Sequence, residues 1–437
     1  MTKRARTTEG SEQQPALFDI SYMTFATSTE NSFDHYDTDH LQSVSSTSLL
    51  ENLPPEIRHN ILLNSPDLQS LRNLTKASPT FHAQYKRSEQ SERSILQATL
   101  AREFDGFVAD AVATVESGGM CSNSKQDSVT NVDIRNFFID YKSDLENEDS
   151  LELFDGMSLE CTKYLLRYHL TTIVPLSEEL AKQAMTNFAN SIPNDTPSLD
   201  KSLATGIQLS LKEKQRLMQA LYRLETYYNL FGSRIHRCEF ARASFVTKEV
   251  LPLFKPWGIE AMACIQVLAK EFLQSTVEQA YEDQFRNSEK CSLLNAAERD
   301  SFVYGIIPLG VQTMALFYKA RSDPTLLYPA ISEHASMEDN LDPQFLSMLR
   351  YAETVTGDEA VLPRDVRYSD QAPFGMSEVS WSRSDVIIGD WVPKAFRSWG
   401  YAIWDSHRWT EIEQRLGFLG TVWIDEARER NRLRSLA

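Results

Sequence analysis

The chain has 437 residues, of which 42% are hydrophobic and 24% are charged, a composition typical of globular protein with room for two or three domains. Lys and Arg total 44 against 61 Asp and Glu, which gives a formal net charge of −17. Because such a charge repels phosphate backbones and anionic lipid surfaces, we expect neither nucleic acid nor a membrane surface as a partner.

Residues 1–47 are rich in Ser, Thr, Asp, Glu and Gln and show no sustained period. We therefore predict that this acidic, Ser/Thr-rich segment is a disordered tail. It contains one apolar island, made of Phe18, Ile20, Tyr22, Met23 and Phe25. Two interpretations of the island stay open, a short docking segment or a strand-like patch with no role.

Residues 53–85 carry the spacing of three short helices. Pro54 and Pro55 suit a first helical turn, where a missing N–H costs nothing, and Asp67 and Ser78 can cap the second and third helices. The apolar positions that recur at helical spacing are Ile57, Ile61, Leu62, Leu68, Leu71, Leu74, Phe81 and Tyr85. A unit this small buries too little apolar surface to be stable alone, so its faces require a partner or the rest of the chain.

This segment resembles an F-box. The resemblance is carried by Leu53-Pro54, Glu56-Ile57, Ile61-Leu62 and Asp67-Leu68, followed by Leu71, Leu74 and Phe81, which stands where many F-boxes have Trp. It implies a module over residues 48–90 that docks on a Skp-family adaptor and so joins a cullin-RING ubiquitin ligase. The implied adaptor-binding residues are Leu53, Pro54, Ile57, Ile61, Leu62, Leu68, Leu71, Leu74 and Phe81. In the alternative interpretation, downstream helices cover these faces, and the module binds no adaptor.

Residues 91–350 are predicted to form an irregular multi-helix domain. Apolar residues recur every three or four positions from Leu96 to Ala111, which predicts one long amphipathic helix, and residues 117–128 read as a flexible loop that begins at Gly118 and Gly119. Further helices are predicted over Asp133–Tyr141, Leu159–Tyr168, Glu178–Asn190, 217–231 with a C-cap at Gly232, a face from Met262 to Phe272, and Gln312–Arg321. The locally basic stretch from Lys212 to Lys248 is interpreted as a solvated face rather than a contact with acidic groups.

Residues 351–437 are predicted to be a loop-rich region packed on the helical domain. Residues 355–395 lack a helical period, with one short strand signal at Val386–Ile388, and helical character returns over Tyr401–Leu419. Six of the seven tryptophans lie in this region. We favour a core role for them, and the alternative is a recognition groove for a partner. The possible partner-recognition residues are Trp391, Trp399, Trp404 and Trp409.

No motif for catalysis, metal or cofactor appears in the sequence. The cysteines are widely separated and form no CxxC pair, so we expect reduced thiols and no metal site. His407 follows Asp405 by two residues, a spacing that does not share a helical face, so we expect a structural histidine rather than a catalytic one. The N-terminus lacks a secretory h-region, and the uncharged run 301–318 is too interrupted to span a bilayer, which predicts a buried loop–helix junction.

The sequence therefore predicts an all-α intracellular protein, cytoplasmic, nuclear or both, that is not an enzyme and takes no cofactor. Segments at 216–232, 254–265 and 398–409 also resemble a group of filamentous-fungal F-box-like proteins. The function implied by the resemblance is a ubiquitin-ligase substrate receptor that joins a Skp-family adaptor to a protein target. The alternative is a non-catalytic helical scaffold or interaction protein whose F-box-like unit is internally packed.

Overall fold

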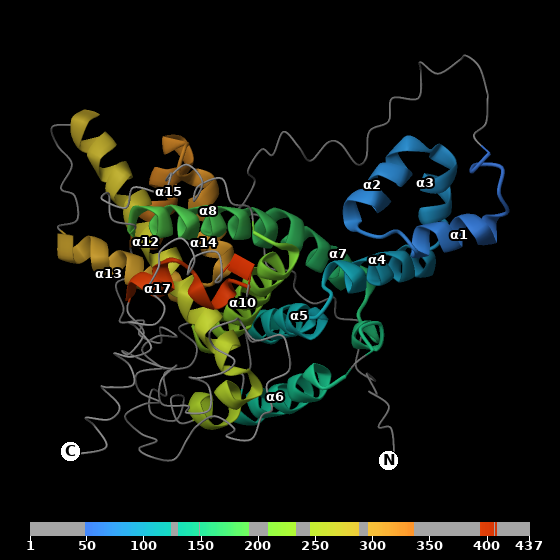
Figure 1. Cartoon of the computed structure of the whole chain (residues 1–437), viewed down its shortest axis with the longest axis horizontal. Helices are drawn as coiled ribbons and strands as arrows, with labels where there is room; N and C mark the ends of the chain where they lie inside the picture. Colours follow the sequence, from blue (N-terminus) through green and yellow to red (C-terminus); the bar gives the residue numbers. More distant parts are fainter. Residues whose placement is uncertain are drawn as a thin grey trace.

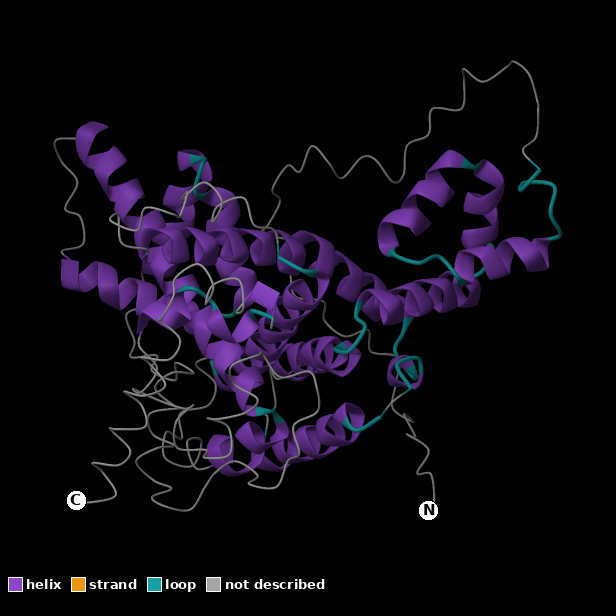
Figure 2. Ribbon diagram, in the orientation of Figure 1, coloured by secondary structure: helices purple, strands orange, loops and turns teal. Residues whose placement is uncertain are grey.

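The computed structural model describes residues 49–123, 130–147, 149–191, 209–232, 245–287, 296–335, 394–405 and 407–408. Within these ranges every regular element is a helix and no strand occurs, which confirms the predicted all-α class (Figure 2). The predicted tail, residues 355–393 of the predicted loop 355–395 and the Val386–Ile388 strand lie outside the described residues. The last two residues of that loop, 394 and 395, are helical instead. In the described part of the chain, no helix is both long and apolar enough to cross a membrane.

In chain order the α-helices are α1 (Pro55–Leu63), α2 (Leu68–Ala77), α3 (Pro79–Tyr85), α4 (Glu89–Glu103), α5 (Val108–Asn123), α6 (Asn131–Leu145), α7 (Leu159–Tyr168), α8 (Val174–Ser191), α10 (Leu211–Phe231), α12 (Pro256–Asn287), α13 (Ala296–Ile306), α14 (Val311–Ala320), α15 (Pro324–Ala335) and α17 (Lys394–Ser398). The short 3-10 and π turns are η4 (Glu152–Phe154), η5 (His169–Ile173), η6 (Val246–Val250), η7 (Leu251–Leu253), η8 (Ile307–Leu309) and η10 (Tyr401–Ile403). The helices predicted in the regions of α6, α7, α8, α10, α12 and α14 are confirmed. The junction predicted over residues 301–318 is η8 and Gly310, which connect α13 to α14.

Helices α1, α2 and α3, with the preceding residues from Leu49, form a small unit at one end of the molecule, drawn in blue in Figure 1. We call residues 49–85 the three-helix unit. The predicted caps are in place: Asp67 accepts a hydrogen bond from the Ser70 N–H at 2.6 Å, and Ser78 Oγ accepts one from the Phe81 N–H at 3.3 Å. The unit packs on α4, and its apolar core also includes Leu159 at the start of α7.

The prediction of one long helix over residues 96–111 is wrong. Two helices occupy this stretch, because α4 ends at Glu103 and α5 begins at Val108. Gly106 lies between them with φ +82°, in the left-handed region that other residues rarely adopt. The loop expected over residues 117–128 is corrected in its first part, since α5 continues through Gly118 and Gly119 to Asn123. Residues 124–128 lie outside the described residues. Contact with α10 stabilises this last part of α5, where Asn229 Nδ2 donates to the buried Ser117 Oγ at 3.1 Å.

Helices α10 and α12 lie at the centre of the larger apolar core and pack against each other. Helix α5 covers α10, and α8 packs on both central helices (Figure 1). The predicted C-cap of α10, Gly232, is a site of close approach, because a Cβ there would lie 2.1 Å from the Pro308 carbonyl oxygen. A side chain at position 232 would therefore push η8 away from the core.

The segment 394–408 is inserted into this core. Phe396, Trp399, Tyr401 and Trp404 are all buried in it. A helix starting at Tyr401 was predicted, but residues 401–403 form a 3-10 turn and Trp404 is extended. Two buried ion pairs fix the segment, with Arg397 bound to Glu260 on α12 at 2.7 Å and Arg408 bound to Glu213 on α10 at 2.6 Å.

The Glu260–Arg397 pair provides a stability test. We expect Arg397→Met to lower the free energy of unfolding by about 3–5 kcal/mol, because it leaves a carboxylate buried without its cation. The double variant Glu260→Met, Arg397→Met should lose less free energy of unfolding than Arg397→Met alone, since no buried charge remains. Urea unfolding followed by circular dichroism measures both.

The matched control is Arg135, whose exposed pair with Glu249 has a 3.7 Å separation. Arg135→Met should change the free energy of unfolding by less than about 1 kcal/mol. If Arg135→Met and Arg397→Met lower the free energy of unfolding by the same amount, the buried pair has no special structural role.

Candidate partner-binding surface

The residues assigned to adaptor binding separate into buried and accessible groups. Leu62, Leu68, Leu71 and Phe81 are buried, with Leu62 at 0% exposure. Leu62, Leu71 and Phe81 form the core of the three-helix unit, and Leu68 joins the larger core. The assignment of these four side chains to adaptor contact is therefore corrected. Since each already packs against α4 or its neighbours, their role is to hold the unit together.

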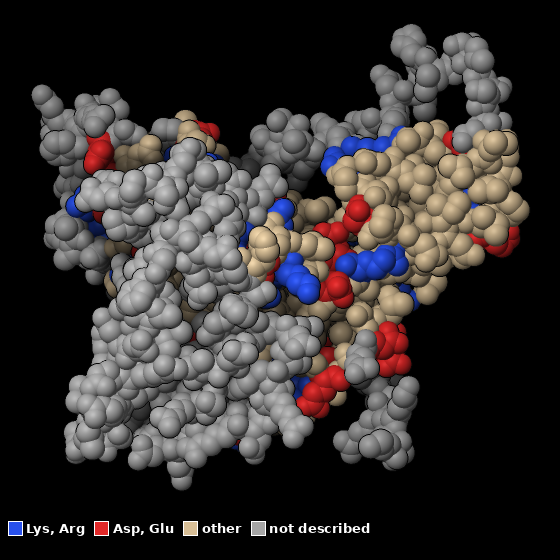
Figure 3. All heavy atoms as spheres, in the orientation of Figure 1, with Lys and Arg blue, Asp and Glu red and all other residues tan. Residues whose placement is uncertain are grey.

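The accessible residues gather at the start of α1. Leu49 is 89% exposed, Leu50 52% and Ile57 45%, and Pro54 is also exposed. Leu53 is half-buried beside them. We call these five residues the α1 surface. Figure 3 shows one face of this end of the molecule, where uncharged side chains (tan) predominate. Ile61 and Leu74, also assigned to adaptor binding, are half-buried.

Glu51 fixes the segment that carries the exposed leucines. Its backbone oxygen accepts a hydrogen bond from Arg58 Nη1 at 2.7 Å, and its carboxylate accepts one from Ser78 Oγ. Ser78 lies between α2 and α3, so Glu51 links the segment before α1 to the far end of α2. This link gives the α1 surface a defined backbone before any partner binds.

The end of α4 connects the three-helix unit to the helical body. Arg102 donates to the backbone oxygens of Leu63 and Ser65, the latter at 2.8 Å from Nε. Glu103 accepts from the Leu68 N–H at 3.4 Å and lies 3.8 Å from His169 Nε2. The His169 contact lowers the pKa of Glu103 below its usual value. The α1–α2 connection is thereby held to both α4 and η5.

The tryptophans that the structure describes in the C-terminal region belong to the core. Trp399 and Trp404 are buried and pack edge-on against Phe188, with centroid distances of 5.5 Å and 5.2 Å. The assignment of these two to partner recognition is corrected, because neither ring is accessible. Trp391 and Trp409 lie outside the described residues.

The pair singled out in sequence, Asp405 and His407, lies at the end of the inserted segment. His407 is exposed, and the Asp405 carboxylate accepts from the Arg408 N–H at 3.0 Å. Asp405 therefore shapes the local turn that presents Arg408 to Glu213.

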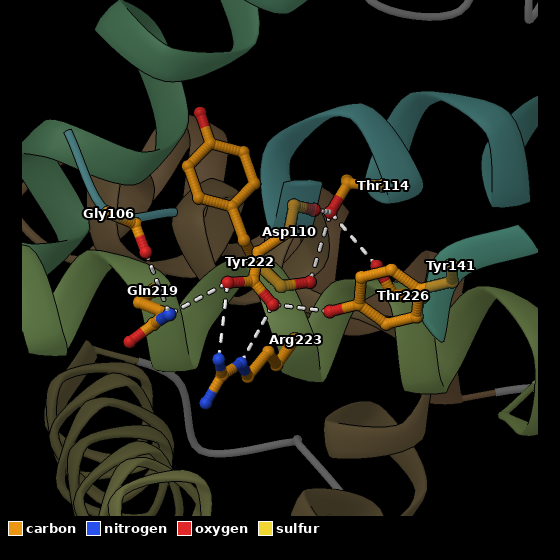
Figure 4. A network of polar contacts seen from close by, with 8 residues as sticks. All are labelled: Gly106, Asp110, Thr114, Tyr141, Gln219, Tyr222, Arg223 and Thr226. Carbon is orange, nitrogen blue, oxygen red and sulfur yellow. Dashed lines mark hydrogen bonds and ion pairs between the residues drawn. The ribbon is translucent and has the colours of Figure 1, made fainter. Parts of the chain in front are cut away.

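Buried Asp110 lies at the centre of a polar cluster, shown in Figure 4. Its carboxylate accepts from Arg223 Nε at 2.7 Å, from Gln219 Nε2 at 2.8 Å and from the Tyr141 hydroxyl. Arg223 was expected on a solvated face, but its side chain is half-buried against Asp110, with 11% exposed. These donors come from α6 and α10 and surround the carboxylate, so we assign Asp110 a structural role.

Glu225 is a different kind of buried acid. Its carboxylate accepts a hydrogen bond from the Val311 N–H at the start of α14, and none of the ion pairs found within the described ranges includes it. Gly310 has φ +102°, and a Cβ there would lie 2.8 Å from Glu225 Oε2, so glycine permits the close approach. Burial raises the pKa of Glu225 to about 7.

This pKa predicts a pH-dependent contribution to stability. The usual pKa of Glu225 is 4.5, so the folded state binds its proton more tightly than the unfolded state. Its contribution is therefore full below pH 4.5 and declines as the pH rises to about 7. Between pH 4.5 and 8, the free energy of unfolding of the wild type should fall relative to Glu225→Gln by about 3 kcal/mol. Urea titrations at several pH values measure the difference, and a pH-independent difference would refute the assignment.

Because α1 has both buried and accessible residues, we expect substitutions on it to differ in their effect on stability. Leu62→Ala should lower the free energy of unfolding by about 2–5 kcal/mol, because it leaves a cavity between α1 and α4. Ile57→Ala on the same helix should cost less than about 1 kcal/mol. Urea unfolding measures the free energy of unfolding of both variants. Similar losses for Leu62→Ala and Ile57→Ala would mean that α1 is packed differently.

Among the described residues, no group of three or more His, Cys, Asp or Glu side chains is arranged to hold a metal ion. Comparison with known protein families, curated proteins and solved structures gives no match. The accessible feature with a defined geometry is thus the α1 surface, together with the half-buried residues beside it.

Proposed function

We propose that the chain is a non-catalytic substrate receptor of a cullin-RING ubiquitin ligase, in which the three-helix unit acts as an F-box-like module for a Skp-family adaptor. The observation that supports this most is the accessibility of the start of α1, with Leu49, Leu50 and Ile57 all exposed. These residues include and adjoin the LPPEI sequence at positions 53–57 on which the F-box resemblance rests. Full burial of an aliphatic side chain contributes about 1.5–3 kcal/mol, so a partner that covers several of them gains substantial affinity.

The position of the unit also supports a receptor. It lies at one end of the molecule and is connected through α4 and α7 (Figure 1). A protein bound on the α1 surface therefore leaves the faces of the helical body accessible for a target. On α6 the exposed Val132 and Ile139 are seven residues apart and share one helical face. This pair is a second apolar position, separate from the three-helix unit.

A second candidate is a scaffold whose three-helix unit binds no adaptor. The burial of Leu62, Leu68, Leu71 and Phe81 favours it, because the unit already satisfies these faces internally. The two candidates differ in one physical respect. A receptor needs the remaining accessible residues for binding, whereas a scaffold does not.

Isothermal titration of the purified full chain with a Skp-family adaptor tests the proposal. We expect micromolar or tighter binding, and at least a tenfold loss of affinity for Ile57→Asp, because the substitution places a charge in the apolar contact. Ile139→Asp is the matched control, since Ile139 is also an exposed isoleucine, on α6, at 60% against 45% for Ile57, and this variant should bind as the wild type does.

Unfolding in urea checks that both variants are folded as the wild type is. The receptor assignment fails if the wild type shows no binding at micromolar concentration, or if Ile57→Asp and Ile139→Asp bind equally well. Either result would favour the scaffold.

A further inference from the structure

The N-terminal segment is attached directly to the α1 surface. Leu49, the most exposed residue of that surface, is the first residue that the structure describes. The sequence before it contains one concentrated apolar element, the island of Phe18, Ile20, Tyr22, Met23 and Phe25. In an extended chain Phe18, Ile20 and Tyr22 fall on one side, which matches an apolar surface of a few side chains.

Charge is complementary at the same place. Between the island and Leu49, residues 26–48 contain Glu30, Asp34, Asp37 and Asp39 and no Lys or Arg. The contact between Glu51 and Ser78 brings the chain from residue 49 onward to the C-terminal end of α2. The last turns of α2 carry Arg72 and Lys76. The acidic residues of this stretch are therefore opposite in charge to the end of α2.

The length of the connection permits contact within one chain. Twenty-three residues lie between Phe25 and Leu49. A flexible connection of this length has a root-mean-square span of about 25–30 Å. That span is comparable to the size of a small domain, and the effective concentration of a segment tethered in this way is on the order of millimolar. Even a weak apolar contact is then substantially occupied.

We propose that residues 18–25 dock on the α1 surface of the same chain and compete there with the adaptor. The competition with the adaptor rests on the proposed function. The docking contact itself does not, and it can be measured without an adaptor. The docked island covers Leu49, Leu50 and Ile57, and the acidic stretch lies toward Arg72 and Lys76. Adaptor binding displaces the island, so its apparent affinity is reduced by the occupied fraction.

The test uses the full chain with Phe18→Ser, Ile20→Ser and Tyr22→Ser combined. The matched control combines Phe33→Ser, Tyr36→Ser and Leu41→Ser, which removes the same number of apolar side chains from the acidic stretch that follows the island. The first measurement is amide hydrogen exchange over residues 50–61 without adaptor. We expect severalfold faster exchange in the island variant and wild-type exchange in the control.

The second measurement is the adaptor Kd, which should fall about threefold to tenfold in the island variant and stay unchanged in the control. Exchange and Kd that are both unchanged in the island variant would overturn the docking. Protection of residues 50–61 that grows with protein concentration would also overturn it, because a second copy would then be the occupant. If no variant binds adaptor, the proposed function fails, and the exchange measurement alone still decides whether the island docks.

Discussion

Three arginines bind fully buried carboxylates in the helical body and so determine which of its segments meet. The pairs join Asp110 to Arg223, Glu213 to Arg408 and Glu260 to Arg397, and in each the guanidinium contacts both carboxylate oxygens. A buried pair of this kind adds little net stability compared with apolar packing, but separating its partners is very unfavourable. The pairs therefore act mainly as constraints on which segments meet. They require α5, α10, α12 and the segment 394–408 to assemble in one arrangement.

The same arrangement determines where the three-helix unit lies. On α10, Tyr222 hydroxyl is 3.1 Å from His169 Nδ1, and the other ring nitrogen of His169 faces Glu103. Glu103 then binds the first amide of α2. A continuous set of polar contacts thus leads from the centre of the body to the unit that carries the α1 surface. In the proposed receptor, these contacts would hold an adaptor and a target in a fixed relative geometry.

Local signals in the sequence were sufficient to predict most helices and their caps. Asp67 and Ser78 cap the helices that they were expected to cap, because capping depends on one side chain and the amide three residues later. The break between α4 and α5 was missed because the residues on both sides of it, Leu100, Phe104, Phe107 and Ala111, are buried in one core, so the apolar spacing continues across the turn. The signal that could have revealed it was Gly106, which adopts a left-handed conformation.

Tertiary information was needed to separate binding residues from core residues. Ile57 and Leu62 are both aliphatic and both lie on α1, and the packing of the neighbouring helices leaves one exposed and buries the other. Arg223 looked like part of a solvated basic face, since its partner Asp110 is more than one hundred residues away. Trp399 and Trp404 had two interpretations, and their partner Phe188 lies in a distant part of the sequence.

The size of the α1 surface limits how the unit can associate. A specific interface of standard size takes about 800 Å² from each partner, and a few exposed apolar side chains supply only part of that area. A protein that binds here as proposed would have to extend over half-buried residues such as Ile61 and Leu74, whose positions depend on the packing of the whole unit. Association then requires the folded unit rather than its first turn alone. Because the exposed centre is small, a tethered apolar segment of similar size is an effective competitor for it.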